Sequence, residues 1–261
     1  MDSKNLKNRL NSKLKDNGSR PTEKKEDTVP VTQPPTPVES NYVALTNNAL
    51  EIINENLKNQ PLSPALFDVV KSPSGGTTVF TVPGLSGDEV EKELQGIILG
   101  YDTPRAYWDT PDPVEGTPPV CFSRDSVVSY EGKPCKLCQF NDFGSKNGET
   151  GAKACKESVS VYLLRQDSIL PIVVRIPVSS KLLFLKYTTR LISNLTPLSG
   201  VVTKIALGKA TNKTGQPYAL YNFEAVSVLS SEEASSAKSF GAKFMEMLNA
   251  AGMEPAIAEV G

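Results

Sequence analysis

The chain has 261 residues, of which 39% are hydrophobic and 22% are charged, which is enough for one substantial domain with flexible ends. No apolar run approaches the roughly 18 residues of a membrane span, and the Lys-, Asn- and Ser-rich start lacks the apolar centre of a signal peptide. The composition therefore argues against a membrane protein and predicts a cytoplasmic one.

The net charge of −1 hides an uneven distribution along the chain. Residues 133–213 contain 13 Lys or Arg against 4 Asp or Glu. A local excess of positive charge indicates an anionic partner for the middle of the chain, and a solvated charged surface is the alternative.

Residues 1–40 are predicted to form a disordered tail, basic at first and then rich in proline. Within it, Leu6, Leu10 and Leu14 recur every four residues among basic side chains. This spacing predicts a short basic amphipathic helix that forms on a partner. The folded domain is expected over residues 41–230, followed by a C-terminal helix and tail over residues 231–261.

The first part of the domain is predicted to contain one helix, capped by Thr46, and four short strands. These strands span residues 67–70, 78–82, 94–101 and 105–108. A turn rich in Pro and Gly separates the first two strands, and residues 105–108 are predicted to pair with residues 94–101 across a turn at residues 102–104. The acidic stretch around residues 88–93 is interpreted as a solvated, helix-like segment.

The second part is predicted to contain two hairpins separated by a helix. The expected strands span residues 159–164, 169–176, 200–207 and 218–229. The helix begins at Ser179 or Ser180, with its buried side predicted to consist of Leu182, Leu183, Tyr187, Leu191 and Ile192. A last helix opens at Ser231. Strands, a helix and two more strands, joined by short connections, follow the order of an OB-fold. The predicted fold is therefore mostly β, in the α+β class, with an OB-fold-like barrel and flanking helices.

Four cysteines lie within 35 residues, and the chain contains no histidine. Cys135 and Cys138 form a Cys-x-x-Cys knuckle between the more distant Cys121 and Cys155. Disulfides are rare in a reducing compartment, whereas four thiolates suit a closed tetrahedral site for one structural Zn²⁺ ion. We predict a zinc-binding insertion at about residues 110–158; a redox-active pair and unrelated buried cysteines are the alternatives.

Catalytic motifs are missing from the sequence. Without histidine there is no Ser-His-Asp or Cys-His arrangement, and a closed four-thiolate site leaves no open position for water. The glycine-rich run at residues 144–153 lacks the Gly-x-x-x-x-Gly-Lys-Ser/Thr pattern of a phosphate loop. The protein is therefore predicted not to be an enzyme.

Aromatic and basic residues alternate in and around the cysteine region, as they do in proteins that bind single-stranded nucleic acid. Lysine and arginine contact the phosphates, and exposed aromatic rings stack on bases. Burial of the aromatic rings in the core is the alternative, because aromatic residues in strands are often buried. The candidate contacts are Arg105, Tyr107, Trp108, Lys133, Lys136, Phe140, Phe143, Lys153, Lys156 and Lys204.

An ordered set of short motifs covers about residues 67–230. The motifs are Gly75-Gly76, Leu94-Gln95-Gly96-Ile97-Ile98, Arg105-Ala106-Tyr107-Trp108, Pro118-Pro119-Val120-Cys121-Phe122-Ser123, Cys135-Lys136-Leu137-Cys138, Phe143-Gly144-Ser145, Ala152-Lys153-Ala154-Cys155-Lys156, Leu170-Pro171-Ile172, Ile176-Pro177-Val178-Ser179-Ser180 and Val202-Thr203-Lys204-Ile205. In this order they resemble a phage family of zinc-containing single-stranded-DNA-binding proteins of the OB-fold type. Val120 and Glu157-Ser158 depart from the pattern, where acidic and basic residues respectively are usual.

The resemblance implies a non-enzymatic, phage-encoded protein in the host cytoplasm that protects or organises single-stranded DNA in replication or recombination. Replisome, recombination or polymerase proteins are the second class of expected partner. In the alternative interpretation, the chain is a zinc-stabilised protein-interaction or transcription-regulatory module that docks on a phage or host polymerase. The salt dependence of oligonucleotide binding distinguishes the two, because phosphate contacts weaken steeply as salt is added.

Overall fold

The structure is a computed structural model that describes residues 42–46, 48–58, 60–70, 73, 75–110, 114, 117–146, 151–212 and 215–251. The chain divides into two units, Met1–Pro34 and Pro35–Gly261, and every described residue belongs to the second. The predicted N-terminal tail and its leucine repeat lie outside the described residues. Among the helices that are described, none has the length and apolar character needed to cross a membrane.

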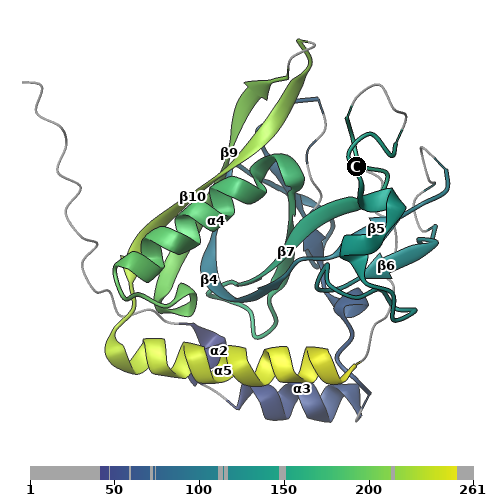
Figure 1. The fold of residues 1–261 in the computed structure, drawn as a ribbon. Coiled ribbons are helices and arrows are strands. Elements are labelled where there is room, and N and C mark those ends of the chain that lie inside the picture. Colours follow the sequence, from purple (N-terminus) through teal and green to yellow (C-terminus); the bar gives the residue numbers. More distant parts are fainter. Residues whose placement is uncertain are drawn as a thin grey trace, which may run out of the picture. The chain divides into compact units, whose positions relative to one another are not determined.

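The described part of the chain contains helices and both short and long strands (Figure 1). In chain order they are α2 (Val43–Thr46), α3 (Ala49–Leu57), η1 (Pro64–Leu66), β1 (Val69–Val70), β2 (Phe80–Val82), β3 (Glu89–Glu91), β4 (Glu93–Asp102), β5 (Arg105–Tyr107), β6 (Cys121–Ser123), η2 (Cys135–Leu137), η3 (Gln139–Asn141), β7 (Lys156–Leu164), β8 (Ile172–Pro177), α4 (Val178–Ser193), η4 (Leu198–Gly200), β9 (Val201–Thr211), β10 (Pro217–Val228) and α5 (Ser231–Ala250).

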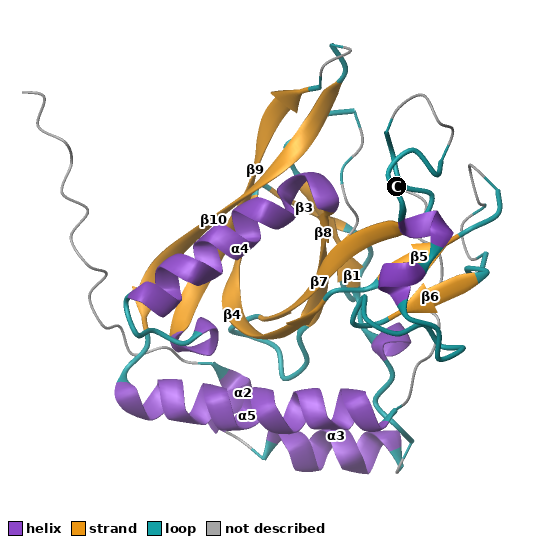
Figure 2. Cartoon of the chain, viewed as in Figure 1, coloured by secondary structure: helices purple, strands orange, loops and turns teal. Residues whose placement is uncertain are grey.

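Six strands form a mixed sheet in the order β1-β8-β7-β4-β9-β10, and Figure 2 shows this sheet curling into a half-barrel. Only the β1–β8 pair is parallel among the described neighbours. Irregularities in the register at Ile98–Gly100 and Ala225–Ser227 bend the long strands. A Cβ atom at Gly96 would lie 2.4 Å from the Leu164 carbonyl oxygen, so the close approach of β4 and β7 requires glycine there.

Both faces of the curled sheet are covered by apolar residues, which explains why β7 is a nearly continuous apolar run. Val161 and Leu163 of β7 belong to a cluster with Phe184 of α4. Tyr162 and Leu164 belong to the cluster that contains α5 residues. Because successive side chains of a strand point to opposite faces, β7 contributes to both clusters at once.

The C-terminal helix α5 is part of the domain core. The Ser230 hydroxyl and the Glu233 carboxylate form a reciprocal capping box at its start. Phe244 is fully buried and makes edge-to-face contacts with Phe67 and Tyr162. Close packing on β4 occurs at Gly241, where an added Cβ would lie 2.9 Å from the Leu99 carbonyl oxygen.

The strand positions largely agree with the predictions, but several pairings do not. The hairpins β7–β8 and β9–β10 and the start of α5 are confirmed. The predicted strands at residues 67–70 and 78–82 are present as β1 and β2, but they do not pair with each other: β1 pairs with β8 and β2 pairs with β3. The helix-like interpretation of residues 88–93 is wrong, since Glu89–Glu91 form a strand.

The predicted pairing of residues 94–101 with residues 105–108 is likewise wrong. Strand β5 pairs with β6 and β7 instead. The half of β4 nearest the turn, residues 97–102, is hydrogen-bonded to β7 instead.

Helix α3 differs from the prediction in its N-cap residue, and helix α4 differs in its first residue and in which side is buried. Asn48, rather than Thr46, precedes α3. Helix α4 begins at Val178, and Leu182 and Ile192 on its predicted buried side are exposed. Buried Ser180 accepts a hydrogen bond of 3.0 Å from the Tyr221 amide, which turns this polar residue, and with it the face bearing Phe184, toward the sheet.

Candidate functional site

The four cysteines lie in the segment between β4 and β7, which we call the cysteine module (residues 103–155). Figure 1 shows β5 and β6 of this module beside β7. Arg105 pairs with Glu157 and Ala106 with Lys156 in the β5–β7 ladder, and Tyr107 pairs with Cys121 in the β5–β6 ladder. Hydrogen bonds between strands therefore attach the module directly to the main sheet.

The cysteine module has almost no apolar core. Its only buried hydrophobic residues among those described are Phe122, Cys135 and Cys155. None of these belongs to the three hydrophobic clusters of the domain, whereas Leu137 and Phe143 are 82% and 84% exposed. Burial of apolar surface therefore contributes little to the stability of the module, and another source of stabilisation is needed.

Backbone hydrogen bonds fix the positions of three of the cysteines. The Cys135 amide donates to the Val127 carbonyl oxygen at 2.8 Å, and the Cys138 amide donates to the Cys135 carbonyl oxygen at 3.3 Å. The Cys155 amide donates to the Phe140 carbonyl oxygen at 2.8 Å. The knuckle and the returning strand are thereby joined within one loop cluster.

All four cysteines line a single cavity of about 550 Å³. Cys135 and Cys155 are buried, and Cys121 and Cys138 are half-buried. Burial raises the pKa of Cys155 to about 12, opposed by the positive charge of Arg105. The pKa of Cys121 is raised first by burial and then by the charge of Cys138. The thiolate forms of Cys121 and Cys155 are therefore disfavoured unless a cation lies nearby.

The predicted metal ligands surround one cavity but do not meet at one point. Among the described residues, no group of three or more His, Cys, Asp or Glu side chains is arranged to hold a metal ion. The donor set fits Zn²⁺ chemically, because thiolates are preferred zinc ligands and two of the four arise from a knuckle. Tetrahedral coordination would require the thiol groups to turn toward a common centre.

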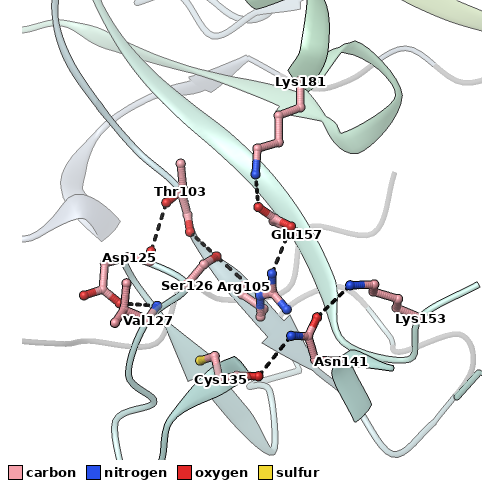
Figure 3. A network of polar contacts seen from close by, with 10 residues as sticks. All are labelled: Thr103, Arg105, Asp125, Ser126, Val127, Cys135, Asn141, Lys153, Glu157 and Lys181. Atoms are coloured by element: carbon pink, nitrogen blue, oxygen red, sulfur yellow. Dashed lines mark hydrogen bonds and ion pairs between the residues drawn. The ribbon is translucent and has the colours of Figure 1, made fainter. Parts of the chain in front are cut away.

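Arg105, predicted as a phosphate contact, is a buried member of an ion-pair network. Its Nη2 atom lies 2.9 Å from Glu157 Oε2, and its side chain is only 9% exposed. Figure 3 shows Glu157 between Arg105 of the module and Lys181 of α4, both of which contact its carboxylate. Arg105 also lines the cysteine cavity, and its buried Nη1 atom has no hydrogen-bond partner within the described part of the chain.

A turn at Asp125 is hydrogen-bonded to the β4–β5 connection, where the module begins. Asp125 Oδ1 accepts hydrogen bonds from the Val127 amide at 2.8 Å, the Val128 amide at 3.2 Å and the Ser123 hydroxyl at 3.0 Å. Burial tends to raise the pKa of Asp125, but these hydrogen bonds to the carboxylate outweigh it and lower the pKa below its usual 3.8. The Thr103 hydroxyl donates to the Asp125 carbonyl oxygen at 3.1 Å (Figure 3).

The four predicted base-stacking residues occupy different environments. Tyr107 and Phe140 stack on each other, with ring centroids 3.9 Å apart and planes 12° apart. The Trp108 indole N–H donates to the Thr117 carbonyl oxygen at 3.1 Å. Phe143 is highly exposed, and the Lys153 ammonium lies 4.5 Å from its ring centroid. Phe143 is therefore the aromatic residue that is most accessible to a base.

The predicted lysines are not equivalent. Lys133 forms an ion pair with Glu131 at 2.5 Å, Lys204 pairs with Glu224 at 2.6 Å, and Lys153 donates to Asn141 Oδ1 at 3.0 Å (Figure 3). Lys136 and Lys156 are exposed. An oligonucleotide would have to compete with Glu131 and Glu224 for two of these cations, so Lys136, Lys153 and Lys156 are the stronger candidates for phosphate contacts.

Sequence reasoning missed the roles of Glu157 and Lys181. Glu157 stood out only as a departure from a basic pattern, and Lys181 was not singled out. The two residues are 24 positions apart, and Arg105 is 52 positions from Glu157. The β5–β7 register brings Arg105 to Glu157, and the packing of α4 brings Lys181 to the same carboxylate, so no local sequence signal identifies the network.

Comparison with known proteins gives no match to this chain among family models, curated proteins or solved structures.

Proposed function

We propose that this chain is a non-enzymatic protein that binds single-stranded DNA on an OB-type barrel, with one structural Zn²⁺ ion in the cysteine module. The observation that carries the proposal is the connectivity of β4, β7, β8, β9 and β10, with α4 inserted between β8 and β9. Strand β4 pairs with both β7 and β9, β7 also pairs with β8, and β9 also pairs with β10. In the order of these five strands, the first therefore pairs with the second and the fourth. This connectivity supports the proposal, because it is the one expected for a five-stranded OB barrel left open between its third and fifth strands.

The location of the cysteine module supports DNA binding. OB-folds bind oligonucleotides on the second and third strands and with the loops that follow the first and fourth strands. The cysteine module follows the first barrel strand, β4, and the connection after Thr211 follows the fourth, β9. The module carries exposed Phe143 and Lys136, which combine the stacking and phosphate-binding functions that single-strand binding requires.

The proposed zinc ion would be held by Cys121, Cys135, Cys138 and Cys155. Support comes from the shared cavity and from the nearly coreless module, because a metal ion stabilises loops that bury little apolar surface. When bound, zinc would supply a cross-link between the knuckle and the two flanking strands. Arg105, next to Cys155, would partly neutralise the negative charge of four thiolates.

The DNA proposal is tested with the zinc-loaded full chain and fluorescein-labelled oligo(dT), by fluorescence anisotropy at about 50 mM and about 200 mM salt. We expect binding at low salt that weakens steeply at higher salt. Phe143→Ala should cost about 1–3 kcal/mol of binding free energy if the ring stacks on a base. Lys243→Ala, an exposed lysine on α5, is the control and should change little.

Absence of binding at low salt would contradict the DNA proposal and favour the alternative of a zinc-stabilised interaction module. The zinc proposal has its own test, because metal content is measured independently of DNA. We expect one zinc per chain, lost in Cys138→Ser and retained in Ser145→Ala. Zinc content that is unchanged in Cys138→Ser would contradict the proposed ligand set. The phage setting and a role in replication or recombination are supported by the sequence resemblance.

A further inference from the structure

The outward face of α4 carries an apolar stripe. Val178, Leu182, Leu185 and Ile192 are 65%, 61%, 36% and 66% exposed. Together with exposed Thr189 they recur at alternating steps of four and three residues. Such a 3-4 repeat lies along one side of a helix and is typical of the seam between two packed helices.

The opposite face of α4 accounts for the packing of this helix within its own domain. Ser180, Phe184, Tyr187 and Leu191 are buried against the sheet. A surface helix normally shows polar side chains on its outer face. The exposed stripe is therefore additional to what the fold needs, and four aligned apolar side chains differ from the scattered ones of an ordinary surface.

The stripe is flanked by positive charge. Helix α4 contains Lys181, Lys186 and Arg190 and no acidic residue. Lys181 is bonded to Glu157, whereas Lys186 and Arg190 are exposed one turn apart. An occupant of this face would therefore meet an apolar seam with two cations along its edge.

We propose that α4 is a docking surface for an acidic amphipathic helix of a partner protein. The partner would bury apolar side chains against the stripe and present carboxylates to Lys186 and Arg190. Charge argues against a second copy of this chain as the occupant, because two paired α4 helices would bring their positive charges close together, where they repel one another. It also argues against residues 1–25 of this chain, which contain 8 Lys or Arg and 3 Asp or Glu. The inference rests on α4 alone and holds whether or not the chain binds DNA.

A designed peptide tests the proposal on the full-length protein. The probe is a fluorescein-labelled three-heptad peptide with Leu at positions a and d and Glu at positions e and g; repulsion between glutamates limits its self-association. A matched peptide carries Lys in place of Glu. By fluorescence anisotropy at low salt, we expect the protein to bind the acidic peptide at least about tenfold more tightly than the basic one.

Variants locate the binding. Leu182→Ser/Ile192→Ser and, separately, Lys186→Glu/Arg190→Glu should each weaken binding of the acidic peptide by at least about tenfold. These side chains are exposed, so thermal unfolding should be nearly unchanged. Leu85→Ser, at an exposed leucine in the turn between β2 and β3, is the control and should bind like the wild type.

Five results would overturn the proposal. In the first three, the acidic peptide does not bind, or the basic peptide binds equally well, or the α4 variants bind like the control. In the fourth, sedimentation equilibrium shows self-association that Leu182→Ser/Ile192→Ser abolishes, so the stripe serves a second copy. In the fifth, vesicles of phosphatidylcholine and phosphatidylserine bind through the same residues, so the stripe serves a lipid surface.

Discussion

The substitution Glu157→Gln tests how the cysteine module is attached to the barrel. Glu157 accepts from Arg105 of the module and from Lys181 of α4, so one carboxylate joins three parts of the fold. Glutamine preserves the size of the side chain but removes its charge. The buried guanidinium of Arg105 would then lack its ionic partner.

The expected cost follows from burial. Removing one partner of a fully buried ion pair destabilises a protein by about 3–5 kcal/mol. The side chains of Arg105 and Glu157 are 9% and 19% exposed, so we expect a value near the lower limit, about 3 kcal/mol. Lys181→Met should cost about 1 kcal/mol or less, because Lys181 is 27% exposed and its removal leaves the Arg105–Glu157 pair intact.

Urea unfolding followed by two probes measures both the size and the location of the effect. The single tryptophan of the chain, Trp108, lies in the module, so its fluorescence reports on the module. Far-UV circular dichroism reports on the long helices α4 and α5. We expect Glu157→Gln to shift the Trp108 transition more than the dichroism transition, because the module loses its ion pair with the sheet and keeps only the β5–β7 backbone hydrogen bonds.

Two outcomes would refute this reasoning. One is a loss of less than about 1 kcal/mol in Glu157→Gln, which would mean that water compensates the Arg105 charge. The other is an equal loss of stability in Glu157→Gln and Lys181→Met, which would mean that the Arg105–Glu157 ion pair contributes no more than the Lys181–Glu157 ion pair. Arg105→Leu/Glu157→Leu serves as the companion variant, since removal of both charges should cost less than removal of one.

Three further predictions concern the core, the Asp125 turn and the rotation of α4. Phe244→Ala should cost about 3–5 kcal/mol in denaturant unfolding, because its ring is fully buried; a value below about 1 kcal/mol would mean that α5 is not part of the core. The stability that the Asp125 carboxylate contributes is present above its usual pKa of 3.8 and is lost as pH falls through its lower folded-state pKa. The stability difference between wild type and Asp125→Asn, measured by thermal unfolding, should therefore be largest near neutral pH and shrink below about pH 4; a difference independent of pH would contradict this. Ser180→Ala should cost about 1–2 kcal/mol by loss of the hydrogen bond to Tyr221, while Ser179→Ala, exposed and adjacent, should be nearly neutral in the same urea assay.

Local features could be predicted well from the amino-acid order. The hairpins β7–β8 and β9–β10 join neighbouring apolar segments across short polar breaks, and the Ser230–Glu233 capping box acts within one helical turn. These signals depend on residues close together in the chain, so the sequence contains all the information they need.

Long-range features could not be obtained in this way. The parallel pairing of β1 with β8 joins residues about a hundred positions apart, and the rotation of α4 depends on a hydrogen bond that Ser180 accepts from the Tyr221 amide of β10. An amphipathic pattern predicts a helix. When two sides of that helix are apolar, the pattern cannot show which side is buried and which stays exposed.

The cysteine module combines both kinds of information. The Cys135–Cys138 knuckle is a local turn and is recognisable from its spacing, whereas the shared cavity with Cys121 and Cys155 depends on how β5 pairs with β6 and β7. The role of Arg105 changed most: its neighbours along the chain suggested a surface cation, but the register of β5 on β7 buries it against Glu157. Spacing along the chain determines local turns and helix ends, whereas burial and charge pairing depend on which distant segments the sheet brings into contact.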